Sequence, residues 1–304
     1  MIETMIKVKG LTKQYGNMFA VNGISFEVQK GEVFGLLGPN GAGKTTTLEC
    51  LEGIRKPDSG ELNVAGCNPL SDGRNLRRNL GVQLQSSSLP DGIRVDEAMS
   101  LVCAWHGIPV RFDLLKRFGI NDFSKKQYHA LSTGQKRRLH LALSLASNPK
   151  VVILDEPTAG LDVQGRAQLH DAIRNLKSEG ITTLLATHDM AEAEMLCDHL
   201  AIMVRGEIAI TGTPEQVTAV GNTETRIVIR TKNNSLLPGR DIGSARFIKV
   251  TEEYVEWVCS DVATSVMDIL KQVQAAGDTT EDLRVQKPSL EERFLELVDR
   301  REHK

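Results

Sequence analysis

A glycine-rich segment with one lysine, Gly38–Thr45, has the residue types and spacing of a phosphate-binding loop. It matches the pattern G-x-x-x-x-G-K-[ST], follows the apolar run 33–37 and precedes a helical pattern. Its glycines let backbone N–H groups converge on phosphate oxygens, while Lys44 supplies a positive charge and Thr45 a hydroxyl that can bind Mg²⁺. We therefore expect a nucleotide to contact Gly38, Pro39, Asn40, Gly41, Ala42, Gly43, Lys44, Thr45 and Thr46.

Two carboxylates, Asp155 and Glu156, come directly after the apolar run 151–154. Acidic side chains at the carboxyl end of a buried strand lie where open α/β sheets bind their ligands. An acid pair alone could be a solvated strand end, but beside a phosphate loop we expect Asp155 to hold Mg²⁺ and Glu156 to polarise the attacking water. His188 follows another apolar run, 183–187, and could reach the γ-phosphate, although a lone histidine more often has a structural role.

These residues need elements that bring them together, and about the first 215 residues alternate apolar strands with amphipathic helices. The strands are expected at 6–10, 24–28, 32–37, 61–65, 81–84, 151–154, 183–187 and twice around 200–210, and the helices at 43–53, 132–147, 164–178 and 190–197. This alternation indicates an α/β fold with a mainly parallel central sheet. We expect antiparallel strands near the N-terminus.

A different pattern follows a boundary near residues 214–222. Strands at 226–230, 246–250 and 254–259, a helix at 262–276, a short strand at 283–285 and a terminal helix from Ser289 predict a small accessory domain, of the order β-β-α-β-α. We therefore divide the chain into residues 1–218 and residues 219–304. The smaller, α+β domain contains no catalytic constellation that can be identified from its sequence.

The composition limits the possible functions. The 304 residues are 40% hydrophobic and 25% charged, and the 37 Lys and Arg side chains nearly balance the 39 Asp and Glu side chains. No basic block could bind a nucleic-acid backbone, so we expect no nucleic-acid partner. No apolar run approaches the roughly 18 residues of a membrane-spanning helix. The first ten residues lack the apolar core of a secretory signal and the five cysteines form no CxxC pair, which favours the cytoplasm.

The segment Leu131–Gln135, here called the signature segment, reads Leu-Ser-Thr-Gly-Gln and precedes an amphipathic helix. Ser132 and Gln135 fit an S-x-x-Q capping box, so a helix should begin here and its first N–H groups could meet an anion. The order and spacing of the phosphate loop, this segment and the acid pair resemble the ATP-binding subunit of ATP-binding-cassette (ABC) transporters. The resemblance covers about residues 5–215 and implies a P-loop NTPase fold of the ABC type, with a short helical subdomain.

The resemblance assigns roles to further residues. Tyr15 matches the aromatic residue that stacks on adenine, and Gln85 matches the glutamine that contacts Mg²⁺ and relays a change to the membrane partner. Residues 159–162, which end in Asp162, match the loop that crosses the dimer interface, and His188 matches the family's switch histidine. The predicted catalytic residues are thus Glu156, His188 and Gln85, and the predicted Mg²⁺ ligands are Thr45, Gln85 and Asp155.

The mechanism of the family implies a head-to-tail dimer, either of two copies or with a second ATP-binding subunit. ATP on Lys44 of one chain is then covered by Ser132, Gly134 and Gln135 of the other, and Asp162 lies at the same interface. Closure of this dimer would drive a separate integral-membrane permease between two states. The resemblance therefore implies ATP and Mg²⁺ as cofactors, ATP hydrolysis as the activity, and a peripheral position on the inner face of the cell membrane.

Two features depart from the family pattern. Thr133 stands where a glycine is usual, and its β-branched side chain could crowd the closed interface or add a hydroxyl contact. The stretch 94–130 is short for the helical subdomain, so we expect one helix to be trimmed and the docking surface for the membrane subunit to be altered.

The direction of transport is predicted from similarity to one branch of the family. The signature segment with its basic continuation, the run 156–162 and the closing run 289–298 are similar to the drug-exporter branch of the family. We therefore expect an exporter, with an importer subunit as the first alternative. A soluble ABC ATPase is a further alternative, but such proteins usually have two cassettes or a long coiled-coil insertion. A nucleotide-binding regulator that does not hydrolyse ATP would conflict with the presence of Glu156, His188 and Gln85. The transported substrate cannot be read from this chain.

Overall fold

The computed structural model describes residues 3–85, 88–220, 224–287 and 289–302, and the chain divides into two compact units. The first, here called the cassette unit, comprises Met1–Pro214, and the second, the C-terminal unit, comprises Glu215–Lys304. The domain boundary expected between residues 218 and 219 stays a prediction. Residues 221 and 222, at the end of the boundary region that the sequence suggests, lie outside the described residues.

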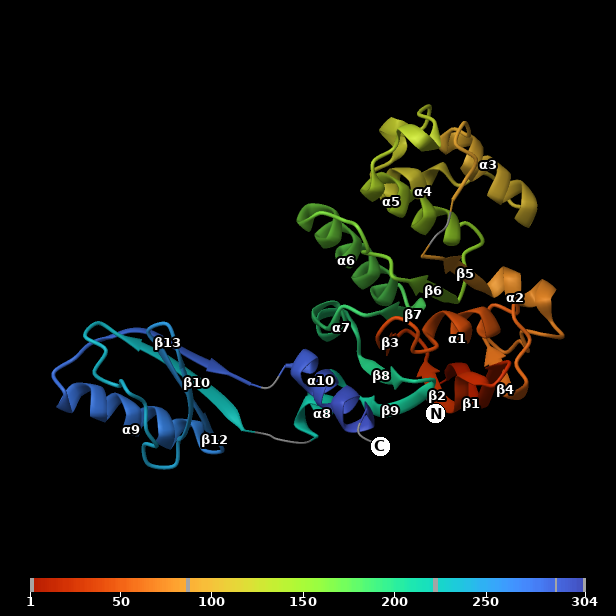
Figure 1. The fold of residues 1–304 in the computed structure, drawn as a ribbon. Coiled ribbons are helices and arrows are strands. Elements are labelled where there is room, and N and C mark those ends of the chain that lie inside the picture. Colours follow the sequence, from red (N-terminus) through yellow and green to blue (C-terminus); the bar gives the residue numbers. More distant parts are fainter. Residues whose placement is uncertain (1–2, 86–87, 221–223, 288, 303–304) are drawn as a thin grey trace. The chain divides into compact units, whose positions relative to one another are not determined.

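A six-stranded sheet forms the centre of the cassette unit (Figure 1). Its strands are, in spatial order, β5 (Leu80–Gln83), β6 (Val151–Asp155), β7 (Thr182–Thr187), β3 (Val33–Leu37), β8 (His199–Val204) and β9 (Glu207–Gly212). The first five are parallel and β9 is antiparallel to β8. Every residue of β3, β6 and β7 is buried, which explains why these strands have continuous rather than alternating apolar sequences.

The antiparallel N-terminal strands are confirmed as a second sheet, in which β1 (Thr4–Tyr15) pairs with β2 (Met18–Gln29) and β4 (Ser59–Val64). Both β1 and β2 are longer than the apolar runs 6–10 and 24–28 predict. The pairing of β1 with β2 is irregular between Val8 and Leu11, beside Gly10, which has a φ of 62°. The sequence pattern predicts that a strand ends at Gly10, but in the structure this residue is part of a bulge within one continuous strand.

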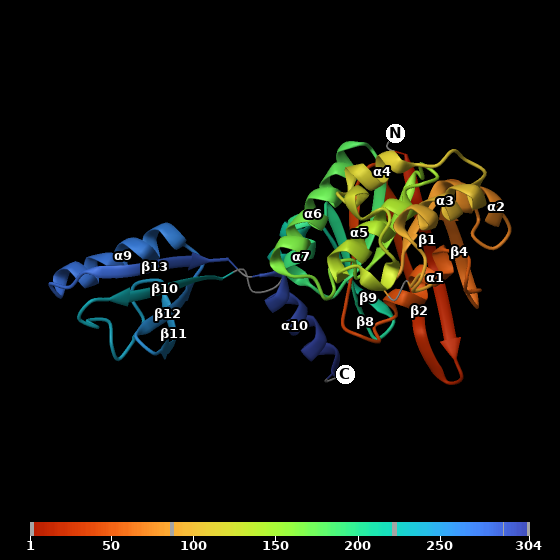
Figure 2. The same ribbon diagram turned by 90° about the horizontal axis from the view of Figure 1, so that it is seen from above.

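Four helices of the cassette unit correspond to predicted ones: α1 (Lys44–Leu51), α5 (Thr133–Ser144), α6 (Val163–Ser178) and α7 (Met190–Leu196). The structure adds α2 (Gly73–Asn79), α3 (Val95–His106) and α4 (Phe112–Arg117), together with 3₁₀ turns at Asn121–Phe123 and Tyr128–Ala130. Helices α3 and α4 lie beside α5 at one end of the unit, and β1, β2 and β4 lie at the other (Figure 1). Figure 2 looks onto the end with α3, α4 and α5 from above. The expected short helical subdomain is therefore present.

The C-terminal unit contains a second antiparallel sheet, whose spatial order is β11-β12-β10-β13. Its elements are α8 (Pro214–Ala219), β10 (Thr225–Thr231), β11 (Arg246–Thr251), β12 (Tyr254–Cys259), α9 (Val262–Ala275), β13 (Thr280–Gln286) and α10 (Leu290–Glu302). Three strands precede α9, so the expected order β-β-α-β-α is wrong by one strand. Helix α9 packs on the sheet through Ile269 and Val273, in a core around the fully buried Trp257.

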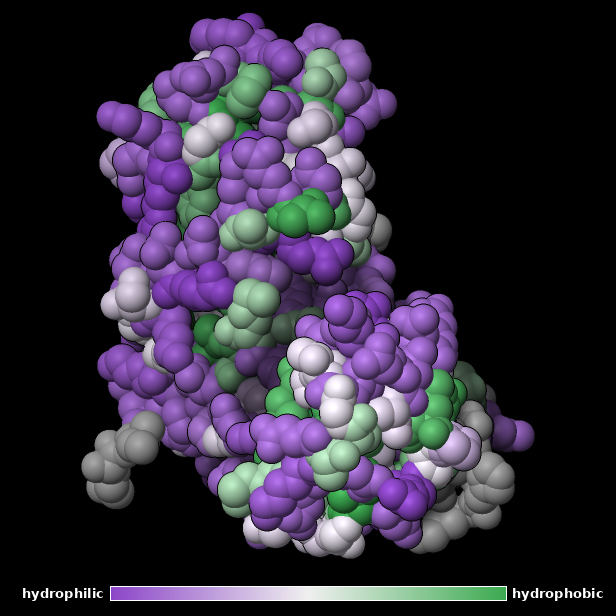
Figure 3. Space-filling model, turned by 90° about the vertical axis from the view of Figure 1, so that its left-hand side faces the viewer, coloured by the Kyte–Doolittle hydropathy of each residue, from purple (hydrophilic) through white to green (hydrophobic). Residues whose placement is uncertain are grey.

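In the part of the chain that the structure describes, none of the helices is both long and apolar enough to cross a membrane. The face drawn in Figure 3 is mainly hydrophilic, and its hydrophobic side chains lie in small separate groups.

Candidate active site

The phosphate loop connects β3 to α1, and the fold itself requires glycine at two of its positions. Gly43 has a φ of 102°, and a Cβ atom there would lie 2.2 Å from the carbonyl oxygen of Ala20. A Cβ atom on Gly38 would lie 2.4 Å from the carbonyl oxygen of Met203. The side chain of Lys44 turns back across the loop, and its Nζ donates to the carbonyl oxygens of Gly38 at 2.6 Å and Pro39 at 3.2 Å.

Lys44 is buried, and burial lowers the pKa of its ammonium group. Two backbone carbonyls satisfy part of its hydrogen-bonding capacity but carry no formal charge. A phosphate group at the start of α1 would supply the missing negative charge, at a helix end that already favours anions. The loop is therefore prepared for an anionic ligand.

A cavity of about 810 Å³ opens beside this loop. Its lining includes the loop residues 40–46, the aromatic side chains of Tyr15 and Phe19, and the side chains of Gln85 and Glu156. The ring of Tyr15 is partly exposed, and the guanidinium of Arg55 lies 5.2 Å from its centre. An aromatic face and a phosphate loop in one cavity of this size provide contacts for the base and the phosphates of one nucleotide.

The carboxyl ends of three neighbouring parallel strands bring the predicted catalytic residues together. Glu156 follows β6, His188 follows β7 and Gln85 comes shortly after β5. The Nε2 atom of Gln85 donates to Glu156 Oε2 at 2.8 Å, and His188 Nδ1 lies 2.9 Å from Glu156 Oε1. Each oxygen of the Glu156 carboxylate thus has its own partner, which fixes the plane of the carboxylate.

The backbone at Glu156 is strained, with a φ of 46°. Residues other than glycine rarely adopt this backbone conformation. Strained conformations of this kind are concentrated at functional sites, where the surrounding structure maintains them. Here the carboxylate of this residue lies between Gln85 and His188.

Asp155 and Thr45 form the second acidic part of the site. Thr45 Oγ1 donates to Asp155 Oδ2 at 3.3 Å, and Asp155 is buried at the end of β6. Burial, and then the neighbouring Glu156 carboxylate, raise the pKa of Asp155. A hydroxyl oxygen and a carboxylate oxygen at this separation are suitable donors for Mg²⁺. Gln85 is bonded to Glu156 instead, so its role as a metal ligand stays a prediction.

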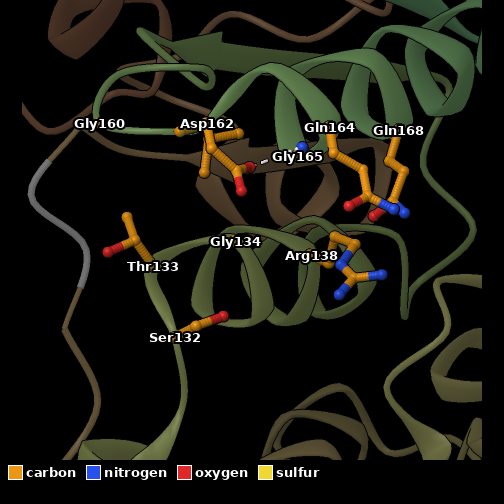
Figure 4. A pocket seen from close by; sticks show the side chains of 10 residues that line it. Ser132, Thr133, Gly134, Arg138, Gly160, Asp162, Gln164, Gly165 and Gln168 are labelled. Atoms are coloured by element: carbon orange, nitrogen blue, oxygen red, sulfur yellow. Dashed lines mark hydrogen bonds between the residues drawn. The ribbon is translucent and has the colours of Figure 1, made fainter.

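A second cavity, of about 410 Å³, lies between the N-termini of α5 and α6 (Figure 4). We call it the signature groove; it is lined by Ser132, Thr133, Gly134, Arg138, Gly160, Leu161, Asp162, Gln164, Gly165 and Gln168. None of these residues lines the nucleotide cavity. The two predicted halves of a nucleotide site are therefore separate surfaces of the cassette unit.

Both helices at the signature groove begin with a side-chain cap. Gln135 N donates to Ser132 Oγ at 3.2 Å, and Ser132 N donates to Gln135 Oε1 at 3.0 Å, which is the capping box that the sequence predicts. Gly165 N donates to Asp162 Oδ1 at 2.8 Å, so Asp162 caps α6. These bonds hold the polar side chains that line the groove in fixed positions.

Gly134 differs from the glycines of the phosphate loop. It lies in the first turn of α5, and the nearest atom to a Cβ there would be Leu161 Cδ2 at 3.8 Å, an ordinary contact. The chain's own fold therefore has room for a side chain at this position. A Cβ on Gly160 would likewise meet only Thr133 Cγ2, at 3.8 Å, so Thr133 fits within the chain without crowding it.

Arg137 is a residue whose role the sequence does not reveal. It lies within the basic run 136–138, which alone indicates only a charged first turn of α5. Its Nη1 atom donates to the carbonyl oxygens of Gln85, at 2.9 Å, and Leu84, at 3.4 Å, and burial lowers the pKa of its guanidinium. Arg137 thus connects the helix of the signature segment to the segment that presents Gln85.

Comparisons with known proteins agree with this geometry. The family model described as "ABC transporter" matches residues 21–159. The chain is 33% identical to the daunorubicin resistance ATP-binding protein DrrA3 of Streptomyces coeruleorubidus, over 99% of this chain and 98% of that protein. It is 29% identical to the linearmycin resistance ATP-binding protein LnrL of Bacillus subtilis, over 97% of this chain and 99% of that protein.

Two further comparisons cover 70% and 72% of the chain. The Nod factor export ATP-binding protein I of Ralstonia nicotianae is 39% identical over 70% of this chain and 68% of that protein. Among solved structures, CbiO1 of Clostridium perfringens, described as part of the ABC transporter complex CbiONQ, has a TM-score of 0.65 and 34% identity, over 72% of this chain and 92% of that chain. From its sequence, fold and site together, the chain belongs to the family of ABC transporter ATP-binding proteins, the ATPases of these transporters.

Proposed function

We propose that this chain hydrolyses ATP to drive export through a separate integral-membrane permease. The observation that carries the catalytic part is the carboxylate of Glu156, fixed by Gln85 and His188 at the edge of a cavity that contains a phosphate loop. In this position Glu156 can accept a proton from the water that attacks the γ-phosphate, and the two neighbours orient its lone pairs. Mg²⁺ would neutralise phosphate charge when it is bound by Thr45 and Asp155.

Residues of a second subunit complete the site in this proposal. The signature groove contains two capped helix N-termini that face solvent, and its Gly134 leaves space that the chain's own fold does not need. Close approach of a phosphate explains that space, since backbone N–H groups bind an oxyanion best where no side chain intervenes. We therefore propose a head-to-tail dimer, with a second copy or a related subunit, that places ATP between Lys44 of one chain and Ser132, Gly134 and Gln135 of the other.

Export is supported by the relatives that span both units, since two of them are named as resistance proteins for daunorubicin and linearmycin. The Nod factor relative is named as an export protein. An importer subunit is the second candidate. Binding to a permease would place the chain on the inner face of the cell membrane, where ATP is available. The balanced charge of the chain argues against a nucleic-acid partner.

A pull-down tests this proposal. Tagged chain with Glu156→Gln is purified from detergent-solubilised cells with and without ATP, and its partners are identified by mass. An integral-membrane protein recovered at a fixed ratio supports the transporter. Ribosomes or nucleic acid in its place would support a soluble ABC ATPase and contradict the proposal. Substrate efflux from cells, measured against Lys44→Ala, then separates an exporter from an importer.

A further inference from the structure

The aromatic ring of Tyr15, which lines the nucleotide cavity, has two positively charged side chains over it. The guanidinium carbon of Arg55 lies 5.2 Å from the ring centre, and the Nζ atom of Lys13 lies 5.6 Å from it. Neither cation is among the described residues that line the cavity. The two charges therefore act on the ring from outside the cavity, and the part of the ring that lines the cavity is available to a ligand.

A carboxylate fixes Lys13 beside the ring. The Nζ atom of Lys13 donates to Asp58 Oδ1 at 2.8 Å, and Asp58 Oδ2 accepts from the backbone N–H of Gln14, the residue before Tyr15, at 2.7 Å. These bonds, the one from Lys13 first, hold the pKa of Asp58 below its usual range, so the carboxylate is ionised. The Lys13 side chain is only 16% exposed, which shields its charge from water.

A second carboxylate fixes Arg55, which follows the end of α1. The Nε atom of Arg55 donates to Glu49 Oε2, and its backbone N–H donates to the carbonyl oxygen of Glu49 at 3.0 Å. Both ends of the residue are thus attached to the last turn of α1. Because Lys44 lies in the first turn of the same helix, α1 connects the phosphate loop to the cation over Tyr15.

The side chains beside Tyr15 in the cavity favour recognition of a base through its flat faces. Met18, which is paired with Tyr15 between β1 and β2, and Phe19 also line the cavity, and both are exposed. These apolar side chains offer no donor or strong acceptor to the edge of a base. Contacts with a base in this part of the cavity therefore depend mainly on stacking.

A cation over an aromatic ring changes how that ring stacks. The face of an aromatic ring carries partial negative charge, which attracts a cation and opposes the face of a second aromatic ring. Lys13 and Arg55 draw electron density toward themselves, so the part of the Tyr15 ring in the cavity opposes a stacked base less. The two cations also fix the ring before binding, which lowers the entropic cost of ordering it.

We propose that Lys13 and Arg55 are positioning residues for the nucleotide, which hold the Tyr15 ring and strengthen its stacking on the base without contacting the nucleotide themselves. The inference rests on the proposed function, because it takes Tyr15 as the residue that stacks on the adenine of ATP. Its new content is that two charges outside the cavity supply part of the affinity for ATP. These charges act on the binding of the base and not on the binding of the phosphates.

A comparison of ATP with inorganic tripolyphosphate, which has no base, separates the two contributions. We expect Arg55→Gln and Lys13→Gln each to weaken ATP binding to the full chain by about two- to fivefold, measured by calorimetric titration. Tripolyphosphate binding should stay unchanged, which also shows that the variants are folded. Equal weakening of ATP and tripolyphosphate binding would overturn the proposal.

Lys56→Gln is the matched control for the loss of one positive charge. Lys56 is the exposed neighbour of Arg55 in the sequence, and it makes no ring contact with Tyr15 among the contacts described. We expect its replacement to leave ATP affinity unchanged. A loss as large as that of Arg55→Gln would show a general effect of charge and would overturn the proposal.

A double-mutant cycle with Tyr15→Leu tests whether the charge acts through the ring. Tyr15→Leu alone should weaken ATP binding at least about fivefold, as expected for the loss of one base–aromatic stack. In that background Arg55→Gln should change ATP affinity by less than about 1.5-fold, because the ring through which the charge acts is absent. An effect as large as in the wild-type chain would show that the charge acts on the phosphates directly and would overturn the proposal.

Two further replacements separate the charge of Arg55 from its packing. Arg55→Lys keeps the charge and should recover most of the lost ATP affinity, whereas Arg55→Met keeps only an apolar stem and should behave like Arg55→Gln. Wild-type affinity of Arg55→Met would assign the contact to packing and overturn the proposal.

The two proposals fail in different ways. If Tyr15→Leu binds ATP as tightly as the wild-type chain, the base lies elsewhere, which would overturn this inference and leave the proposed function intact. A wild-type chain that neither binds nor hydrolyses ATP would overturn both.

Discussion

The phosphate loop and the signature groove both present helix N-termini to an anion, but they differ in how far the chain itself completes them. In the phosphate loop the fold requires Gly38 and Gly43, and Lys44 already bonds to the loop's own carbonyl oxygens. In the signature groove the fold has room for a side chain at Gly134. In the proposed dimer, the first site would hold the ligand, and the second would approach a ligand held by another subunit.

This difference explains how ATP could control association. In the proposed dimer, a nucleotide bound in the first site would present phosphate oxygens to the signature groove of the second subunit, so ATP would stabilise the closed dimer by bridging two surfaces. Hydrolysis would then break that bridge. Variants of the two regions should consequently affect different steps, and the predictions below test this separation from the largest expected effect to the smallest.

Replacement of the predicted base should affect turnover most. Glu156→Gln keeps the hydrogen-bonding shape but cannot accept a proton, so we expect ATP hydrolysis to fall by about 10²–10⁴-fold while ATP binding persists and closed dimers accumulate. Steady-state phosphate release and size-exclusion chromatography with ATP measure the two effects. Undiminished hydrolysis would show that Glu156 is not the base.

Lys44→Ala should weaken ATP binding to the isolated chain by about 100-fold, because it removes a buried cation from the phosphate site. Lys30→Ala is the control, since Lys30 is exposed and pairs only with Glu3 among the contacts described. Calorimetric titration with ATP measures the change. An affinity equal to that of the control would place the phosphates elsewhere.

Acid should destabilise the helical side of the cassette unit, where α5 contains His140. Burial lowers the pKa of His140 to about 4, so the unfolded chain takes up a proton below about pH 6.5 that the folded chain does not. The contribution of neutral His140 to the free energy of unfolding is therefore fully present above pH 6.5 and decreases as the pH falls toward 4. The decrease between pH 6 and pH 4.5 is about 2 kcal/mol.

Urea unfolding at these two pH values, with the wild-type chain and with His140→Gln, measures this effect. We expect a smaller pH dependence of the free energy of unfolding for the variant than for the wild type. Equal pH dependence of His140→Gln and the wild type would exclude His140 as the source.

Gly134→Asp should leave ATP binding to the isolated chain unchanged but weaken ATP-driven dimer formation at least about tenfold, because a carboxylate would oppose the bound phosphate. The 3.8 Å clearance at this position predicts that the variant folds normally. Analytical ultracentrifugation with ATP, in the Glu156→Gln background, measures dimer formation. A loss of ATP affinity in the monomer would place this residue in the first site.

The smallest effect should come from Thr133→Gly. Its methyl group fits against Gly160 within the chain, so the monomer should bind ATP unchanged, and dimer affinity should shift by about two- to threefold, the scale of one van der Waals contact. The direction of that shift shows whether the side chain crowds or supports the interface. A change of monomer affinity would contradict the separation of the two regions.

The comparison also shows which features could be predicted from the sequence. The buried strands β3, β6 and β7 are continuous apolar runs, which placed Glu156 and His188 at the carboxyl ends of strands; the contact between these two side chains is a finding of the structure. The capping box of Ser132 was likewise visible, because it depends on residues three positions apart. Local spacing and sheet geometry were sufficient for these features.

Features that depend on distant packing could not be predicted. The bond between Arg137 and the Gln85 carbonyl joins segments about 50 residues apart, and nothing in a basic run identifies its partner. Gly10 reads as a strand end, although neighbouring strands hold it within β1.

The central claim is that each complete ATP site combines the phosphate loop of one chain with the signature groove of another. We would build heterodimers with two different tags in the Glu156→Gln background and combine Lys44→Ala with Gly134→Asp, either both on one copy or one on each. If sites are shared between chains, one change on each copy leaves one complete site, and both changes on one copy leave none.

The measurement is the amount of ATP occluded in the purified heterodimers. The account predicts occluded ATP when the two changes lie on different copies and none when they lie on the same copy. The reverse result, with ATP occluded only when both changes lie on one copy, would show that each chain completes its own site and would contradict the account.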